Sequence, residues 1–197
     1  MGISGAWKNR IREMRAIGDN SGAIKELRKA KMSNDYYNTS DKNKIFIDYC
    51  LAYHYYRDEQ YELSNIYLSN ICDKFNEDVK NREDMKLEYC NYLWLNVNVN
   101  YNSMDIESIV NNMTVVYNYY LDLKECDVAV SALENIFRFK GDSEKVLECL
   151  SELMKSKYIS DWNFVDSILR DCSDISYNLY IKALNIVNSY KLKIDTV

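Results

Sequence analysis

Proline is absent from this chain of 197 residues, although average usage would give roughly ten. Glycine occurs only five times, and neither residue type is found between positions 23 and 140. Sheets built from β-hairpins normally place glycine or proline at their turns. The scarcity of both residues favours helices, and we predict an all-α protein.

The sequence also lacks the features of membrane, secreted and metal-binding proteins. No apolar run approaches the length of a membrane span, and the N-terminus has no signal-peptide core. Six cysteines are widely separated, with no Cys-x-x-Cys pair and only one histidine to assist them. We therefore expect buried, reduced thiols, no metal or other cofactor, no membrane association and a cytoplasmic location.

Catalytic motifs are missing as well. Neither a G-x-x-x-x-G-K nor a G-x-G-x-x-G phosphate loop occurs, and no nucleophile lies beside a base in a recognisable pattern. His54 stands between Tyr53 and Tyr55, where a packed or surface imidazole is the simpler interpretation than a catalytic one. The sequence predicts that the protein is not an enzyme.

Charge is distributed unevenly along the chain. The net charge is −5, which argues against general affinity for nucleic acid. Residues 1 to 33 nevertheless contain eight Lys and Arg residues against three acidic residues, a local charge of +5 that leaves −10 for the remainder. This basic end is suited to an acidic partner, to nucleic acid, or to the acidic part of a second copy. The simpler alternative is a solvated face of the first helix pair.

Residues 49 to 72 show the clearest organisation, with two amphipathic helical stretches separated by a polar turn. Leu51, Ala52, Tyr55 and Tyr56 form the face of the first stretch, and Tyr61, Ser64, Leu68 and Ile71 form the face of the second. Polar residues 57 to 60 supply the turn between them. The small side chains of Ala52 and Ser64 predict a close approach of the two helix backbones.

Similar hairpins recur along the whole chain. We predict units over residues 4–37, 44–78, 87–122, 127–156 and 161–192, with turns near positions 18, 59, 104, 141 and 173 and a single repeat domain over 1–197. Residues 95 to 102 alternate apolar residues with asparagine, which is a strand signature. The helical spacing of Trp94, Val97 and Tyr101 favours a helix there, and the strand stays an open alternative.

The repeated unit resembles the tetratricopeptide repeat. Trp7 with Gly18, Ala23 and Ala30 matches that pattern, Leu51, Ala52, Tyr55, Tyr61 and Ser64 match it again, and Trp94 with Tyr101 matches in part. The closing proline of that family is missing, and most of the intervals between turns exceed 34 residues. The resemblance implies a right-handed solenoid of about five antiparallel helix pairs. It extends to helical-repeat regulators such as the peptide-pheromone receptors of bacteria and phages, without their DNA-binding domain.

In such a solenoid the first helix of each pair lines a concave groove. The residues predicted to face it are Lys8, Arg12, Arg15, Tyr49, Tyr53, Tyr56, Arg57, Asn96 and Asn100. Arginines can bind a carboxylate, tyrosines can hold side chains, and amides can hold a peptide backbone. We therefore expect a regulatory interaction protein that binds a peptide or protein segment, with Tyr55 and Tyr61 at packing positions. The alternative is that the tyrosines pack between repeats and that the asparagines reflect composition alone.

Two other functions remain open from the sequence. The basic first hairpin suits a nucleic-acid-associated regulator, whose binding would weaken steeply with salt. A homodimer formed end to end through Trp7 or Trp162 is also consistent with a solenoid that has no polar cap.

Overall fold

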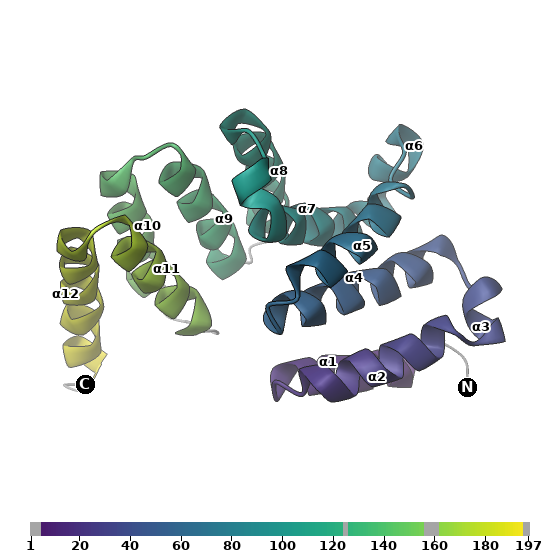
Figure 1. Ribbon diagram of the computed structural model, residues 1–197. Coiled ribbons are helices and arrows are strands. Elements are labelled where there is room, and N and C mark those ends of the chain that lie inside the picture. Colours follow the sequence, from purple (N-terminus) through teal and green to yellow (C-terminus); the bar gives the residue numbers. More distant parts are fainter. Residues whose placement is uncertain (1–4, 124–125, 156–161, 195–197) are drawn as a thin grey trace. The chain divides into compact units, whose positions relative to one another are not determined.

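The computed structural model describes residues 5–123, 126–155 and 162–194. These residues form helices joined by short connections, with no strand among them (Figure 1). The all-α prediction is confirmed. The helices divide into two compact units, Met1–Asn102 (unit 1) and Ser103–Val197 (unit 2), and each is described by itself. The division falls between the two helices of the predicted third pair.

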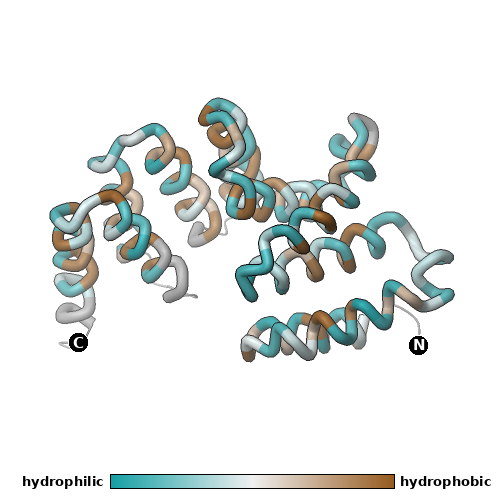
Figure 2. Tube along the Cα trace, viewed as in Figure 1, coloured by the Kyte–Doolittle hydropathy of each residue, from teal (hydrophilic) through white to brown (hydrophobic). Residues whose placement is uncertain are grey.

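Unit 1 consists of helical hairpins followed by one further long helix. Its elements are α1 (Gly5–Ala16), α2 (Asn20–Lys31), α3 (Asn34–Tyr37), α4 (Asp41–Arg57), α5 (Tyr61–Cys72), α6 (Glu77–Lys80), η1 (Glu83–Met85), α7 (Lys86–Asn100) and η2 (Tyr101–Ser103). Helix α2 packs on α1 and α4, and α4 packs on α5. Brown apolar and teal polar segments alternate along these helices (Figure 2), as expected when each helix buries one face.

Helix α7 resolves the ambiguity of residues 95 to 102. The helix continues to Asn100, and a single 3-10 turn follows. Leu95 and Val97 are both buried although residues two apart point to different sides of a helix. Because α7 packs against both α4 and α5, it buries more than one side, and an alternating pattern is compatible with a helix.

Unit 2 contains the remaining long helices. They are α8 (Ile106–Asp122), α9 (Cys126–Phe139), α10 (Ser143–Lys155), α11 (Trp162–Ile175) and α12 (Tyr177–Ile194). Helix α9 packs on α8 and α10, while α12 packs on α10 and α11. Val146, Leu150 and Leu153, spaced along one face of α10, lie in the centre of the apolar core.

Three tight turns share one hydrogen-bonding pattern. Gly18, Glu59 and Gly141 each adopt a positive φ, of 74°, 59° and 72°. In each case the next residue donates its backbone N–H to the carbonyl five residues earlier, as in Asp19 to Met14 at 2.9 Å. This is the Schellman arrangement, which ends one helix and allows the next to begin immediately. The turns predicted near positions 18, 59 and 141 are therefore confirmed.

The predicted close approach within residues 49 to 72 is also confirmed. Ala52 and Ser64 are both fully buried, and the Ser64 hydroxyl donates to the Ala52 carbonyl oxygen at 2.9 Å. A larger side chain at either position would separate α4 from α5. The small residues therefore set the distance between these two helices.

Some predicted details were wrong. Tyr61 is 48% exposed rather than packed, because it is the first residue of α5 and lies at the edge of the turn. The turn expected near residue 173 comes slightly later in the chain. Position 173 is still inside α11, which ends at Ile175, and α12 begins at Tyr177. Cys72 is exposed, whereas Cys50, Cys90, Cys149 and Cys172 are buried free thiols as predicted. The side chains of Cys126 and Trp162 lie outside the described part of the chain.

Candidate functional site

The cations of α1 lie over aromatic rings of α4. Lys8 Nζ is 4.9 Å from the centroid of the Phe46 ring, and the guanidinium carbon of Arg15 is 3.9 Å from that of Tyr53. The order of these pairs shows that α1 and α4 run in the same direction. We call the surface formed by Lys8, Arg12, Arg15, Phe46, Tyr49 and Tyr53 the α1–α4 face. It unites five of the predicted groove residues with Phe46, which the sequence analysis missed.

Electrostatics on this face favour a fixed positive charge. Burial disfavours the charged form of Arg15, but Tyr49 and Tyr53 outweigh it and raise its pKa above the usual value. Burial raises the pKa of Tyr49 to about 12, with Arg15 opposing, so that its hydroxyl stays neutral. The Tyr49 and Tyr53 rings are 6.3 Å apart. Arg12 is exposed and donates to Asn9 Oδ1 at 3.2 Å.

Two predicted residues lie at the end of α4 next to the turn. The Tyr56 ring lies 6.1 Å from the ring of Tyr61, the first residue of α5. Arg57 is the last residue of α4 and is exposed. Tyr56 and Arg57 therefore lie beside the turn between α4 and α5, outside the α1–α4 face as defined above.

The predicted amides lie on α7 and pair with each other. Asn100 Nδ2 donates to Asn96 Oδ1 at 2.9 Å, which confirms that the two side chains share one side of the helix. Both residues are half-buried. An ion pair between Lys42 and Glu88 at 3.5 Å joins α4 to α7. Burial lowers the pKa of Lys8, and the Glu88 carboxylate opposes this shift.

His54 is a structural group. It is 1% exposed, and its Nδ1 lies 2.8 Å from Asn20 Oδ1 at the start of α2. Burial, with a contribution from Arg15, lowers the pKa of His54 to about 4. The imidazole is therefore neutral at physiological pH and joins α4 to α2, as the packed interpretation predicts.

A buried ion-pair cluster centred on Asp48 was missed by the sequence analysis. Asp48 is fully buried, and its two oxygens accept from Lys31 Nζ at 2.5 Å and Lys74 Nζ at 3.1 Å. Lys31 also lies over the rings of Tyr36 and Tyr67. An acidic residue directly after the apolar run of residues 45 to 47 was the available signal, because a carboxylate on a buried face needs cationic partners.

A second buried charge cluster was also missed, and it lies in unit 2. Glu134 is 1% exposed, and Arg138 stands between it and Asp171. The signal in the sequence was again an acidic residue within a largely apolar helix.

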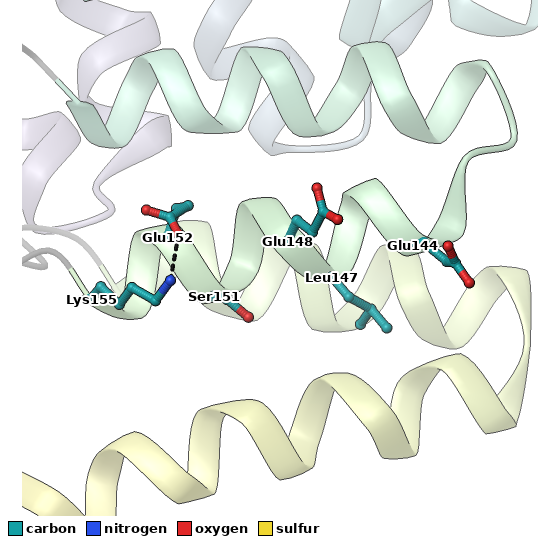
Figure 3. A pocket seen from close by; sticks show the side chains of 6 residues that line it. All are labelled: Glu144, Leu147, Glu148, Ser151, Glu152 and Lys155. Atoms are coloured by element: carbon teal, nitrogen blue, oxygen red, sulfur yellow. Dashed lines mark hydrogen bonds and ion pairs between the residues drawn. The ribbon is translucent and has the colours of Figure 1, made fainter.

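An open depression of about 430 Å³ lies along α10 in unit 2 (Figure 3). Its lining is formed by Glu144, Leu147, Glu148, Ser151, Glu152 and Lys155. Lys155 Nζ pairs with Glu152 Oε1 at 2.5 Å. The depression contains none of the residues predicted to bind a partner, and its carboxylates stand on one solvated helix face.

The described residues show neither a metal-binding cluster nor a membrane-spanning helix. Among the described residues, no set of three or more His, Cys, Asp or Glu side chains is arranged to hold a metal ion. Within the same residues, no helix combines the length and the apolar character needed to cross a membrane. Comparisons with protein-family models, curated proteins and solved structures give no match to this chain.

Proposed function

We propose that the protein is a non-enzymatic interaction module that binds an acidic, extended peptide or protein segment along the α1–α4 face. The stacking of Arg15 on Tyr53 is the observation that supports this most directly. A guanidinium held over a ring has its charge kept in place and can still offer N–H groups to a carboxylate. Binding would then require little further ordering of the side chain.

The composition of the face explains the preference for an acidic segment. Lys8, Arg12 and Arg15 recur on one side of α1 within the part of the chain that carries a net charge of +5. Tyr49 and Tyr53 lie beside them as large, rigid contact surfaces. Charge attracts an acidic segment, and the rings supply apolar contact area once it is bound.

The repeated hairpins support the same function. Ala23 and Ser64 stand at equivalent positions, five residues after the positive-φ residues Gly18 and Glu59, and both are fully buried. This regularity agrees with the resemblance to tetratricopeptide repeats, whose stacked helix pairs present extended binding surfaces. By analogy with helical-repeat regulators, we propose that the protein sequesters or bridges its partners in the cytoplasm.

Affinity capture from the native host, followed by mass spectrometry, identifies the partner and tests the proposal. The variant Tyr53→Ala should lose the partner that the unmodified chain captures, while its circular dichroism remains helical. A matched control is Tyr37→Ala, because Tyr37 is exposed and lies outside the α1–α4 face. Equal capture by both variants would contradict the proposed site.

A nucleic-acid-associated regulator is the second candidate. The observation that favours it is the exposure of Lys25 and Arg28 on α2. Phosphate contacts from these residues would give binding that weakens steeply as salt rises and that does not depend on Tyr53. Mobility shifts at low and moderate salt distinguish the candidates, since absence of a shift at low salt leaves only protein partners.

A further inference from the structure

Glu134 occupies a position that the other hairpins fill with an apolar residue. Seven residues before the positive-φ turn residue, α1 has Ile11, α4 has Ala52 and α9 has Glu134. All three side chains are almost completely buried, with exposures of 1%, 0% and 1%. Burying a carboxylate at this packing position costs free energy unless the group is paired with a cation, hydrogen-bonded or neutralised by a proton.

The geometry around Glu134 places two carboxylates on one cation. Arg138 Nε is 3.6 Å from Glu134 Oε1 on the same helix and 3.5 Å from Asp171 Oδ2 on α11. Neither Glu134 Oε1 nor Arg138 Nε makes a hydrogen bond within the described part of the chain. Arg138 Nη2 instead donates to Asn135 Oδ1 at 2.5 Å. With both acids ionised, the cluster carries one uncompensated negative charge.

Among the residues that the structure describes, no neighbouring element offers Glu134 a second cation. The buried thiols Cys149 on α10 and Cys172 on α11 lie near it, and burial and Glu134 raise the pKa of each above its usual value. The acidic residues of α8 are Glu107 and Asp122, at its two ends, and both are exposed. The charged residues of α10 and α11 outside the cluster are exposed: Glu144, Lys145, Glu148, Glu152 and Lys155 on α10, and Asp166, Arg170 and Asp174 on α11.

We infer that Glu134 retains a proton in the folded protein at neutral pH, and that the packing of α11 against α9 through Arg138 and Asp171 depends on that proton. Deprotonation places a second carboxylate charge on Arg138 in the interior, where it competes with Asp171. Unit 2 therefore contains a proton-sensitive connection between α9 and α11, and this connection weakens as the pH rises.

The direction of the pH dependence follows from the raised pKa of Glu134 in the folded protein. Burial, with a contribution from Asp171, raises the pKa of Glu134 to about 8, while Arg138 opposes the shift. In an unfolded chain the pKa of glutamate is about 4.3. Between these values the folded state holds a proton that the unfolded state has lost, so stability is greatest at the acidic end and falls as the pH rises through this window.

The proton itself can be observed in the full-length protein. Infrared spectra at pH 6.5 should show the C=O band of a protonated carboxylic acid, absent from Glu134→Gln but retained in Glu148→Gln, an exposed control on α10. In Asp171→Asn the band should disappear at a lower pH than in the unmodified chain, because Asp171 contributes to retaining the proton. Identical spectra of the unmodified chain and Glu134→Gln at pH 6.5 would overturn the inference.

Hydrogen exchange tests the coupling to α11. Protection of the α11 amides, corrected for intrinsic exchange rates, should fall between pH 6.5 and 8 by on the order of tenfold per pH unit. Glu134→Gln, a neutral side chain of similar shape, should keep its protection over this range. An equal fall in both proteins, or none in the unmodified chain, would overturn the coupling even where the band is present. If circular dichroism shows that Glu134→Gln does not fold, the infrared titration of Asp171→Asn decides. An acid band that disappears at the same pH as in the unmodified chain would then overturn the inference.

Discussion

The guanidinium of Arg15 on α1 lies 3.9 Å from the ring of Tyr53 on α4, and this contact joins two predicted binding residues that are far apart in the sequence. The pair has two roles in our interpretation. It helps to hold α1 beside α4, and it presents a fixed positive charge to a partner.

The structural role of this pair can be measured with a double-mutant cycle. Tyr53→Leu and Arg15→Gln should each lower the free energy of unfolding, and the coupling between them should be about 0.5–1 kcal/mol, as for a surface cation–aromatic contact. Urea denaturation followed by circular dichroism gives the values. Tyr37→Leu is the control, because Tyr37 is 70% exposed and lies outside the α1–α4 face. A coupling near zero would show that the stacking does not stabilise the fold.

Substitution of Asp48 should destabilise unit 1 more than substitution of most other polar residues there. Asp48→Asn leaves Lys31 and Lys74 without their carboxylate, and breaking a buried ion pair costs about 3–5 kcal/mol. We expect the lower end of this range, because the two lysine side chains remain 28% and 26% exposed and can reach water. Asp41→Asn is the control on the same helix, since the Asp41 side chain is 78% exposed and its ion pair contributes little. Similar unfolding midpoints for both variants would contradict this assignment.

His54 predicts a pH dependence opposite in sign to that of Glu134. Its folded pKa of about 4 lies below the ordinary value of 6.5, so the unfolded state binds the proton more tightly. Stability from this group is complete above pH 6.5 and is lost as the pH falls toward 4, by about 1.4 kcal/mol at pH 5.5.

Nuclear magnetic resonance can follow His54 directly, because it is the only histidine in the chain. The ring signals should stay those of a neutral imidazole at pH 5.5 in the folded protein and should titrate near 6.5 in urea. His54→Gln should show less loss of stability than the unmodified chain between pH 6.5 and 5.5. A folded titration midpoint near 6.5 would refute the burial argument.

Glu59 carries a conformational cost that glycine would relieve. A non-glycine residue with positive φ costs roughly 1–2 kcal/mol, whereas the extra freedom of glycine when unfolded costs about 0.5–1 kcal/mol. Glu59→Gly should therefore raise the free energy of unfolding by about 0.5–1 kcal/mol. Gly18→Ala at the equivalent turn should lower it by about 0.5–1 kcal/mol, because the backbone strain is partly offset by the reduced freedom of the unfolded chain and the added Cβ meets no atom within 4 Å. Thermal unfolding of both variants tests the pair, and a destabilised Glu59→Gly would contradict the strain assigned to this turn.

Much of the local structure could be predicted because it depends on nearby residues. Ala52 and Ser64 were expected to allow a close helix contact, and the hydrogen bond between them at 2.9 Å shows that contact. Tyr61 was predicted incorrectly, because its helical spacing matched the buried face although it lies at the first position of α5. Periodicity shows the direction of a side chain but not whether a neighbouring element covers it.

The candidate site was only partly predictable for a related reason. The sequence placed Lys8 and Arg15 on one side of α1 and Tyr53 on another helix, and their stacking depends on the parallel packing of α1 and α4. Phe46 was missed because one aromatic residue in an apolar run gives no sign of a cation above it.

The helical class and the turns around Gly18, Glu59 and Gly141 follow from local sequence, because helix periodicity and a positive φ depend on a few adjacent residues. Which charged groups are buried, and what they bind, depends on how the helices pack in three dimensions. Asp48 meets Lys31 and Lys74, and Arg138 meets Asp171, across separate helices. Such pairs form because helices distant in sequence pack together and exclude water, and a one-dimensional pattern does not specify that packing.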